Sequence, residues 1–236
     1  MIVRPIKTDR ILHGQTSIYE VLDKFLPEIS NSSIVVITSK LVAICGDRVV
    51  PFDDIDLDSL TKREADYFLP DSFEHRFTIK NNTLIVRAGI DKNFKRKYYI
   101  LWPNDPQASA NAAREYLVKN SGLNNLGVII TDSISTPLRR GVTGIAIAYS
   151  GFKALNDYTK TSRANIAGGL AAAAVVAMGE GRETTPVAVI EDVPFVSFQD
   201  RNPTKAELDD YYLSIEEDIY EPFLSAVNWQ KGQQNT

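Results

Sequence analysis

Three acidic residues that are far apart in the chain each stand where a predicted strand or helix ends. Asp91 and Asp132 each follow a short apolar run typical of a strand, and Glu180 lies between two glycines after an alanine-rich helical stretch. Carboxylates at the ends of elements can converge on one cleft. Together with the Ser133 hydroxyl and phosphate oxygens, they suit a hard cation such as Mg²⁺ or Mn²⁺. The pattern predicts a divalent metal site built from oxygen ligands.

The alternative interpretation is structural, because an acidic residue after a strand often forms a turn or caps a helix. Glu180 has one further feature that favours cation binding, since the helix end before it carries partial negative charge. The chain has two histidines and one cysteine, Cys45, which disfavours a zinc site of the usual ligands. Both interpretations stay open on the residues alone.

Two polar clusters could bind phosphate groups. Arg139 and Arg140 could hold a phosphate or carboxylate through paired hydrogen bonds, or form surface ion pairs. Thr38, Ser39 and Lys40 could offer hydroxyls and an ammonium group, or simply be a polar strand exit. The standard glycine-rich phosphate loops are absent from the sequence, so a bound nucleotide would be held in another way.

The elements that position these residues are helices and strands in irregular alternation. Helices are predicted at 17–26, 59–69, 105–119 and 165–178, with a last one from 204 that bends or restarts at Pro222. Strands are predicted at 34–37, 42–44, 49–50, 77–79, 83–86, 128–131, 144–150 and 187–190. Because no regular βαβ order occurs, we expect an α+β fold with mixed or antiparallel sheets.

Composition indicates an ordinary globular protein. The 236 residues are 44% hydrophobic and 24% charged, with a net charge of -4, which disfavours general nucleic-acid binding. We expect one domain over 1–236, with the option of two subdomains divided near residue 50 or after Asp200, and a frayed polar tail at 230–236. The longest apolar stretch, 166–178, is shorter than a membrane span. The single buried cysteine fits a reducing, cytoplasmic location.

Six segments in order resemble one known family. They are VVITSK at 35–40, RAGID at 87–91, IITDS, RRGVTGIAIAYSGFKAL, AAAAVVAMGEG and PVAVI. This combination resembles the coenzyme F-420:γ-glutamyl ligase family, with relatives in folate metabolism. The resemblance covers most of residues 1–195.

The resemblance implies an intertwined α+β homodimer that uses GTP or ATP with Mg²⁺ or Mn²⁺. It implies that L-glutamate is joined through its amine to a small carboxylate acceptor, folate-like or deazaflavin-like, by way of an acyl phosphate. By position, it implies metal ligands at Asp91, Asp132, Ser133 and Glu180. It implies nucleotide contacts at Ile11, Thr38, Ser39, Lys40, Asn93, Met178, Gly179 and Gly181. Arg139 and Arg140 are candidate catalytic clamps on chemistry alone.

The sequence departs from the family pattern at three places, of which the last is expected to shape the acceptor pocket. Ala43 stands where many members have a lysine, Phe94 interrupts a GIDxSN segment, and the stretch between Asp157 and Gly168 is shorter. Two alternatives therefore stand beside the ligase. One is a metal- and nucleotide-binding protein without ligase activity, and the other is a nucleotide hydrolase or phosphotransferase acting on another acceptor.

Overall fold

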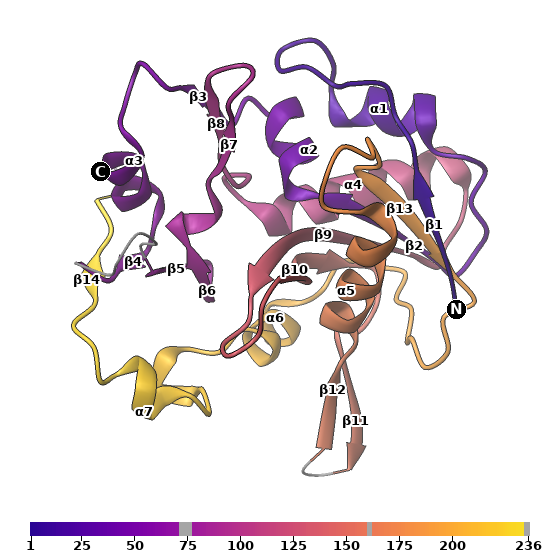
Figure 1. The fold of residues 1–236 in the computed structure, drawn as a ribbon. Coiled ribbons are helices and arrows are strands. Elements are labelled where there is room, and N and C mark those ends of the chain that lie inside the picture. Colours follow the sequence, from indigo (N-terminus) through magenta and orange to yellow (C-terminus); the bar gives the residue numbers. More distant parts are fainter. Residues whose placement is uncertain (71–76, 160–161, 234–236) are drawn as a thin grey trace. The chain divides into compact units, whose positions relative to one another are not determined.

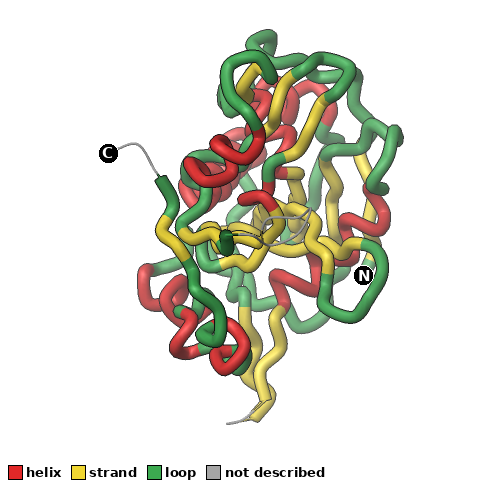
Figure 2. Tube along the Cα trace, turned by 60° about the vertical axis from the view of Figure 1, so that its left-hand side comes forward, coloured by secondary structure: helices red, strands yellow, loops and turns green. Residues whose placement is uncertain are grey.

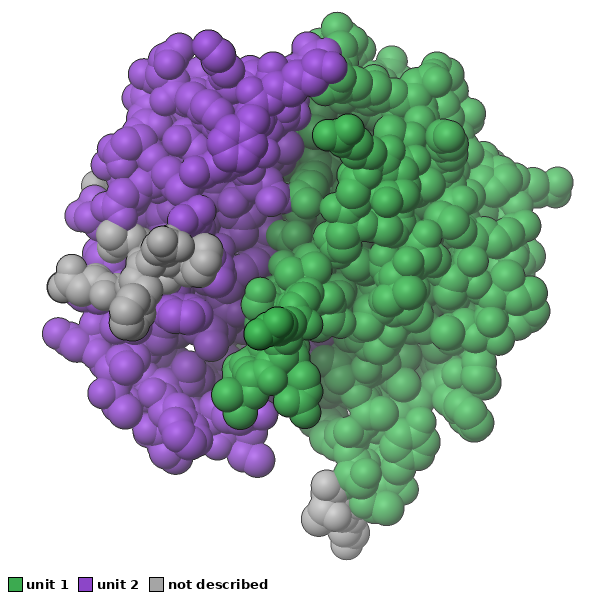
Figure 3. Space-filling view, in the orientation of Figure 1, with its two compact units in different colours: residues 1–47, 103–207 green, residues 48–102, 208–236 purple. Residues whose placement is uncertain are grey.

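The computed structural model describes residues 1–70, 77–159 and 162–233, which divide into two compact units (Figure 3). Unit 1 comprises residues 1–47 and 103–207, and unit 2 comprises 48–102 and 208–236. Each unit is therefore assembled from two separate stretches of the chain.

Unit 1 contains a five-stranded sheet in the order β1-β13-β2-β9-β10 (Figure 1). Its strands are β1 (Ile2–Ile6), β2 (Ser33–Thr38), β9 (Leu126–Ser135), β10 (Val142–Ser150) and β13 (Val187–Glu191). All pairs are antiparallel except β2 and β9, which run in parallel. The mixed sheet confirms the predicted α+β class.

Helices cover both faces of this sheet, which explains why the central strand is apolar along its length. The side chains from Ile34 to Ile37 are fully buried, as expected for a strand covered on both faces. In Figure 1, α5 (Ile166–Met178) lies in front of the sheet and α4 (Pro106–Ser121) behind it. Helices α1 (Ile18–Phe25) and α2 (Ser39–Cys45) complete the main helices of this unit.

Small residues allow α5 to approach the sheet closely. A Cβ atom at Gly144 of β10 would lie 2.6 Å from Cγ2 of Val175 and 2.7 Å from the carbonyl oxygen of Ala171. The glycine is therefore required by the close packing of helix on strand. The alanine-rich helix is therefore a close-packing element of this unit.

Two strands of unit 1 stand apart from the main sheet. β11 (Leu155–Thr159) and β12 (Ser162–Asn165) pair only with each other as an antiparallel hairpin, which projects away from α5 (Figure 2). This hairpin includes most of the stretch between Asp157 and Gly168 that the sequence motifs predicted to be shorter than in the family pattern.

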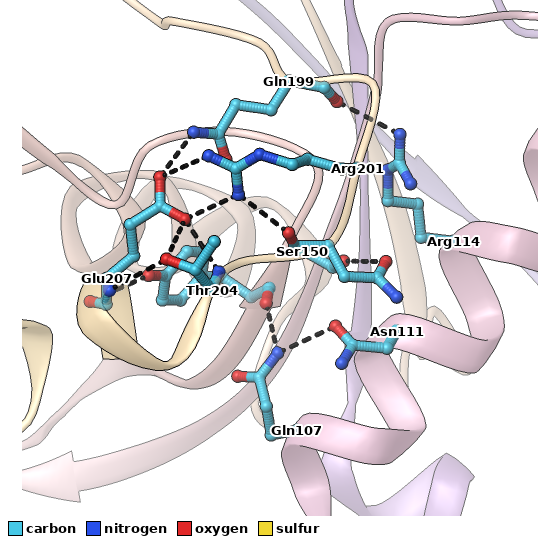
Figure 4. A network of polar contacts seen from close by, with 10 residues as sticks. Gln107, Asn111, Arg114, Ser150, Gln199, Arg201, Thr204 and Glu207 are labelled. Atoms are coloured by element: carbon cyan, nitrogen blue, oxygen red, sulfur yellow. Dashed lines mark hydrogen bonds and ion pairs between the residues drawn. The ribbon is translucent and has the colours of Figure 1, made fainter. Parts of the chain in front are cut away.

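A polar network holds the stretch after β13 against the rest of unit 1 (Figure 4). Glu207 accepts hydrogen bonds from Arg201 at 2.7 Å and from the backbone N–H of Thr204 at 2.8 Å. These donors, Arg201 first, hold the pKa of Glu207 far below its usual value of 4.5. Ser150 of β10 donates to Asn202 at 2.9 Å, which ties the same stretch to the sheet.

Unit 2 contains two smaller antiparallel sheets. One has the order β14-β4-β5-β6 and the other β3-β8-β7. Their strands are β3 (Val49–Pro51), β4 (Tyr67–Phe68), β5 (Phe77–Lys80), β6 (Thr83–Val86), β7 (Asp91–Asn93), β8 (Tyr98–Ile100) and β14 (Gln230–Lys231). The helical elements are α3 (Leu57–Glu64), η1 (Arg87–Gly89), η2 (Ile215–Glu217) and α7 (Glu221–Leu224), while α6 (Lys205–Tyr211) begins in unit 1 and ends in unit 2.

A charged cluster is buried inside unit 2. Glu64 is paired with Arg48 at 2.5 Å and with Lys80 at 2.7 Å, and the side chains of Glu64 and Lys80 are only 10% and 8% exposed. Burial by itself would raise the pKa of Glu64, but the two cations outweigh it and hold the pKa below 4.5.

Several expected elements differ from the structure. The predicted strand at 42–44 is wrong, because Thr38 caps a helix there by accepting from the Leu41 N–H at 3.2 Å. The predicted helix at 59–69 ends at Glu64, since the chain becomes extended at Ala65 and then pairs as β4.

The C-terminal elements also differ. The predicted last helix is broken into α6, η2 and α7, because Ser214 starts a new capped turn and α7 begins separately at Glu221, with Pro222 in its first turn. Within the tail expected to be frayed, Gln230–Lys231 pair with β4, and residues 234–236 lie outside the described part of the chain.

Candidate functional site

A cleft of about 260 Å³ opens in unit 1 where several separate segments meet. Its walls come from residues 8–11, from the start of α2, from 131–133 of β9, and from the end of α5 with the loop that follows it. All four segments lie near the ends of elements or in loops, where binding residues commonly occur.

The register of the sheet explains how Asp132 reaches this cleft. β2 and β9 run in parallel, and their last paired residues are Thr38 and Thr131. Asp132 and Ser133 therefore come directly beyond the point where β2 ends. The sequence interpretation ended the strand at residue 131, whereas β9 continues to Ser135 because it pairs with β10.

Three oxygen-bearing side chains meet in the cleft. Ser133 Oγ donates to Oε1 of Glu180 at 2.5 Å, and the Ser133 backbone N–H donates to Oδ1 of Asp132 at 2.8 Å. The structure thus brings together Asp132, Ser133 and Glu180, three of the four predicted metal ligands. The fourth predicted ligand, Asp91, is the first residue of β7 and belongs to unit 2.

The oxygen atoms of Asp132, Ser133 and Glu180 fit a divalent cation that takes some of its ligands from the protein and the others from a substrate. Mg²⁺ is usually held by one or two carboxylates and by phosphate oxygens, not by a complete protein cage. Asp132 and Glu180 supply two carboxylates, and Ser133 adds a hydroxyl oxygen. Across the residues that the structure describes, no group of three or more His, Cys, Asp or Glu side chains could hold a metal ion. Two carboxylates and one hydroxyl are fewer than the six ligands of an octahedral Mg²⁺ ion, so its remaining positions would be filled by water or substrate oxygens.

Glu180 is held at the cleft by the end of α5. The helix ends at Met178, and Gly179 adopts φ 79° and ψ 163°, a conformation that is essentially restricted to glycine. Gly181 donates its N–H to Oε2 of Glu183 at 2.7 Å, which closes the loop. All of these residues line the cleft, and Met178, Gly179 and Gly181 are three of the residues for which the family resemblance implied nucleotide contacts.

Glu183 is a cleft residue that the sequence interpretation missed. It approaches both glycines, since a Cβ atom at Gly179 would lie 2.7 Å from Cδ of Glu183. An acidic residue two positions beyond a Gly-Glu-Gly segment is a signal that could have found it. The chemistry of this wall is therefore more acidic than the sequence interpretation predicted.

The part of the wall formed by the start of α2 combines hydroxyl and cationic groups. Thr38 and Lys40 line the cleft, and the Thr38 N–H donates to the carbonyl of Pro186 at 3.0 Å. Ser39 is only 2% exposed and does not contribute to the lining. The cluster predicted from the sequence is thus divided, with two of its three residues facing the cleft.

The N-terminal segment forms the remaining wall. Ile11, for which the family resemblance implied a nucleotide contact, lines the cleft together with Thr8, Asp9 and Arg10. The backbone N–H of Thr8 donates to the carbonyl of Thr184 at 2.9 Å, which joins this segment to the loop after α5. Arg10 adds a second cation beside Lys40.

Two predicted residues of unit 1 do not line this cleft, and a third predicted residue belongs to unit 2. Arg139 and Arg140 lie exposed in the turn between β9 and β10, where Arg139 donates to the carbonyl of Leu138 at 3.0 Å. Neither contributes to the cleft wall. Asn93 belongs to unit 2, and its side chain accepts from the Arg96 N–H at 3.1 Å.

Comparison with known proteins identifies the class. A sequence model of the F420-0:gamma-glutamyl ligase family matches residues 5–192, and the chain therefore belongs to this family. This confirms the resemblance found in the sequence motifs.

Similar proteins include three named coenzyme F420:L-glutamate ligase. The one from Methanocaldococcus jannaschii is 34% identical over 145 residues, 56% of this chain and 58% of the relative. That from Methanococcus maripaludis strain C7 is 33% identical over 156 residues, 62% and 60%. That from Archaeoglobus fulgidus is 32% identical over 151 residues, 59% and 57%. The chain thus spans about three fifths of the length of the curated relatives it matches.

No helix among the described residues combines the length and the apolar character that are needed to cross a membrane.

Proposed function

We propose that this protein is a nucleotide- and divalent-metal-dependent ligase that forms an amide bond between L-glutamate and a small carboxylate acceptor. Family membership and the names of the relatives support the glutamate ligase activity. The observation that carries the metal and nucleotide dependence is the group of Asp132, Ser133 and Glu180 oxygens in one cleft.

In this proposal, Asp132, Ser133 and Glu180 hold Mg²⁺ or Mn²⁺ together with phosphate oxygens of the nucleotide. The bound ion would supply positive charge against the triphosphate. Lys40 also lines the cleft and adds a further cation. Thr38, Ile11, Met178, Gly179 and Gly181 are the proposed nucleotide contacts within the cleft.

Four further roles are proposed from the family resemblance or from side-chain chemistry. Asp91 as a metal ligand and Asn93 as a nucleotide contact belong to unit 2. Arg139 and Arg140 are proposed phosphate or carboxylate clamps. GTP and ATP are both retained as candidate nucleotides, and folate-like and deazaflavin-like acids as candidate acceptors.

The proposed reaction has two steps. An acceptor carboxylate oxygen attacks the γ-phosphorus, the bond to the bridging oxygen breaks, and the nucleoside diphosphate leaves with the electron pair. The glutamate nitrogen then attacks the acyl carbon, the carbon–oxygen bond to phosphate breaks, and the nitrogen loses a proton to solvent. Charge stabilisation around the phosphates is the principal contribution expected from the protein.

The test combines activity with binding. The protein is incubated with Mn²⁺ or Mg²⁺, GTP or ATP, L-glutamate and a panel of pterin and deazaflavin acids, and mass spectrometry measures addition of a glutamyl residue. We expect Asp132→Asn to abolish metal-dependent nucleotide binding and product formation, while Glu28→Gln, an exposed acid outside the cleft, leaves both unchanged.

The outcomes separate the competing functions. Nucleotide binding that requires metal but gives no product with any acceptor supports a binding protein without ligase activity. Phosphate release that does not need glutamate supports a hydrolase or phosphotransferase. Binding that survives unchanged in Asp132→Asn removes the cleft as the metal site.

A further inference from the structure

The C-terminal segment of unit 2, residues 208–229, carries charge of one sign. It includes α7 of Figure 1 and contains no Lys, Arg or His. The segment lies beyond residue 192, where the match to the family ends, so family membership assigns it no role. A protein that covers this segment must bring positive charge, because the segment has six carboxylates. They are Asp209, Asp210, Glu216, Glu217, Asp218 and Glu221.

The hydrogen bonds of these acids leave their charge in place. Asp218 accepts from the Tyr220 N–H at 2.8 Å, and Glu217 accepts from the Ser214 N–H at 3.2 Å. Both donors are backbone groups without a net charge, so they orient the carboxylates and do not neutralise them. Glu216 and Glu217 are exposed. The segment therefore presents negative charge to its surroundings.

The same segment exposes large apolar side chains on an ordered backbone. Ile219 is 87% exposed and Phe223 76% exposed. The Leu224 N–H donates to the carbonyl of Tyr220 at 3.0 Å, and the indole N–H of Trp229 donates to the carbonyl of Leu224 at 2.7 Å. Because these bonds order the backbone beforehand, less conformational freedom is lost when a partner binds. Exposed apolar side chains with a polar surround are typical of protein interfaces.

A groove of about 340 Å³ lies between this segment and the β14-β4-β5-β6 sheet. It offers apolar side chains and carboxylates together. Leu84 lines it from the sheet, and Ile215, Leu224, Glu216 and Asp218 line it from the segment. A ligand that fills this groove needs both an apolar group and positive charge.

Hydrogen bonds join the two walls of the groove. The side-chain amide of Asn82, in the turn between β5 and β6, donates to the carbonyl of Leu213 at 2.9 Å. Beyond the segment, β14 pairs with β4, and the Gly232 N–H donates to the carbonyl of Asp66 at 2.8 Å. The groove is therefore formed within unit 2 itself, and a partner does not have to open it.

We propose that the groove and the exposed side chains of residues 219–223 bind a short segment of another protein, one that carries Lys or Arg beside bulky apolar side chains. The apolar side chains would enter the groove, and the cations would face Glu216 and Asp218. Complementary charge guides the encounter, and buried apolar anchors supply most of the affinity. The inference does not rest on the proposed ligase activity.

The surface disfavours three other occupants. A small inorganic cation would leave the apolar part of the groove unfilled. An anionic membrane would be repelled by the carboxylates. A second copy would have to use its own exposed cations, and those around Phe94, at residues 92–97, adjoin Asp91 and Asn93, which already have proposed roles at the metal and the nucleotide.

The test is a selection of short random peptides displayed on phage, with the full chain as the target. We expect the retained peptides to combine Lys or Arg with Leu, Ile, Phe or Trp. The most enriched peptide is then synthesised with a fluorescent label, and anisotropy measures its affinity for the wild type and the variants. Glu216→Lys/Asp218→Lys should bind it at least about tenfold more weakly. Binding to the wild type should weaken as salt is raised, because exposed charges are screened.

Two further variants complete the experiment. Asp53→Lys/Asp54→Lys makes the same change in net charge at exposed acids of unit 2 outside the groove lining, and it should bind the peptide like the wild type. Phe223→Ser keeps every charge and should weaken binding by about tenfold, which decides the matter if the groove charge variant does not fold. Nucleotide binding should be the same in all of these proteins.

Four outcomes would overturn the proposal. They are the absence of retained peptides, retained peptides without cations, equal affinity for the wild type and the folded groove variants, and an equal loss of affinity in Asp53→Lys/Asp54→Lys. Sedimentation velocity adds one more criterion. If Glu216→Lys/Asp218→Lys changes the number of copies per particle, a second copy covers this surface and the proposal is wrong.

Discussion

Ser133 Oγ lies 2.5 Å from Oε1 of Glu180, although 47 residues separate them in the chain. The two meet because β9 passes the end of β2, and because α5 returns its C-terminal end to the same edge of the sheet. Ser133 also donates its backbone N–H to Asp132. One residue therefore fixes the direction of both carboxylates in the cleft.

Replacement of Ser133 tests this relationship. Ser133→Ala removes the donor to Glu180, and we expect metal-dependent nucleotide binding to weaken by about 10- to 100-fold, as for groups that orient metal ligands. Ser133→Thr keeps the hydroxyl and should bind like the wild type. Isothermal titration with GTP in the presence and absence of Mn²⁺ measures the difference. Equal affinity in Ser133→Ala would show that the hydroxyl does not orient Glu180.

Gly179 gives a prediction about stability. Its backbone has φ 79°, and a Cβ atom would lie 2.7 Å from Cδ of Glu183. Gly179→Ala should therefore lower the free energy of unfolding by about 1–3 kcal/mol and displace the loop that carries Glu180. Denaturant titration measures the first effect, and nucleotide binding the second.

Gly169, inside α5, provides a matched control for the Gly179 substitution. A Cβ atom at Gly169 has no neighbouring atom within 4 Å. Gly169→Ala should raise stability by about 0.5–1 kcal/mol, because alanine is the better helix former. If both variants lose stability equally, the special conformation of Gly179 is not the cause.

The buried charge cluster of unit 2 predicts a pH dependence. A carboxyl whose folded pKa is below its unfolded value contributes stability at high pH and loses it as the pH falls through the folded pKa. The pKa of Glu64 is below 4.5, so stability should decline as the pH is lowered from 4.5. Glu64→Gln should flatten that decline. Urea titrations at a series of pH values measure both slopes.

Loss of the Glu64 carboxylate also leaves Lys80 without its buried partner. Removal of one member of a buried ion pair typically costs about 3–5 kcal/mol, and we expect Glu64→Ala to fall in that range at neutral pH. Asp53→Asn, an exposed acid of the same unit, should change stability little. A mild effect of Glu64→Ala would mean that water reaches the cluster readily.

Cys45 should be unreactive in the folded protein. Burial and the charge of Glu20 raise the pKa of this thiol to about 11, so only about one molecule in a thousand is thiolate at pH 8. The rate of alkylation by iodoacetamide measures this directly. Lys119→Cys in a Cys45→Ser background provides an exposed thiol for comparison. A native Cys45 that reacts as fast as this control would contradict the prediction.

Local signals predicted much of the fold. The capping box of Ser17 and Glu20 starts α1, and Asn165 caps α5 by accepting from the Gly168 N–H. The two asparagines at 81–82 form the tight turn between β5 and β6, both with positive φ. These features depend on residues close in the chain, so their patterns carry the structure directly.

The remaining features depend on contacts between distant residues. The apolar stretch after Thr38 is so short that the spacing of its apolar residues fits a strand as well as a helix. The N-cap hydrogen bond of Thr38 favours the helix. β9 extends beyond Thr131 only because β10 pairs with it. Glu183 reaches the cleft through the loop after α5, which sequence spacing alone does not describe.

The position of β2 in the main sheet has a consequence for synthesis on the ribosome. Both of its neighbours come later in the chain, β9 from residue 126 and β13 from residue 187. The apolar residues 34–37 therefore have no strand to pair with until more than half of the polypeptide has been synthesised. Long-range pairing of this kind slows folding and leaves aggregation-prone apolar segments of the nascent chain exposed. Trigger-type chaperones that shield nascent apolar strands should accordingly raise the yield of correctly folded protein.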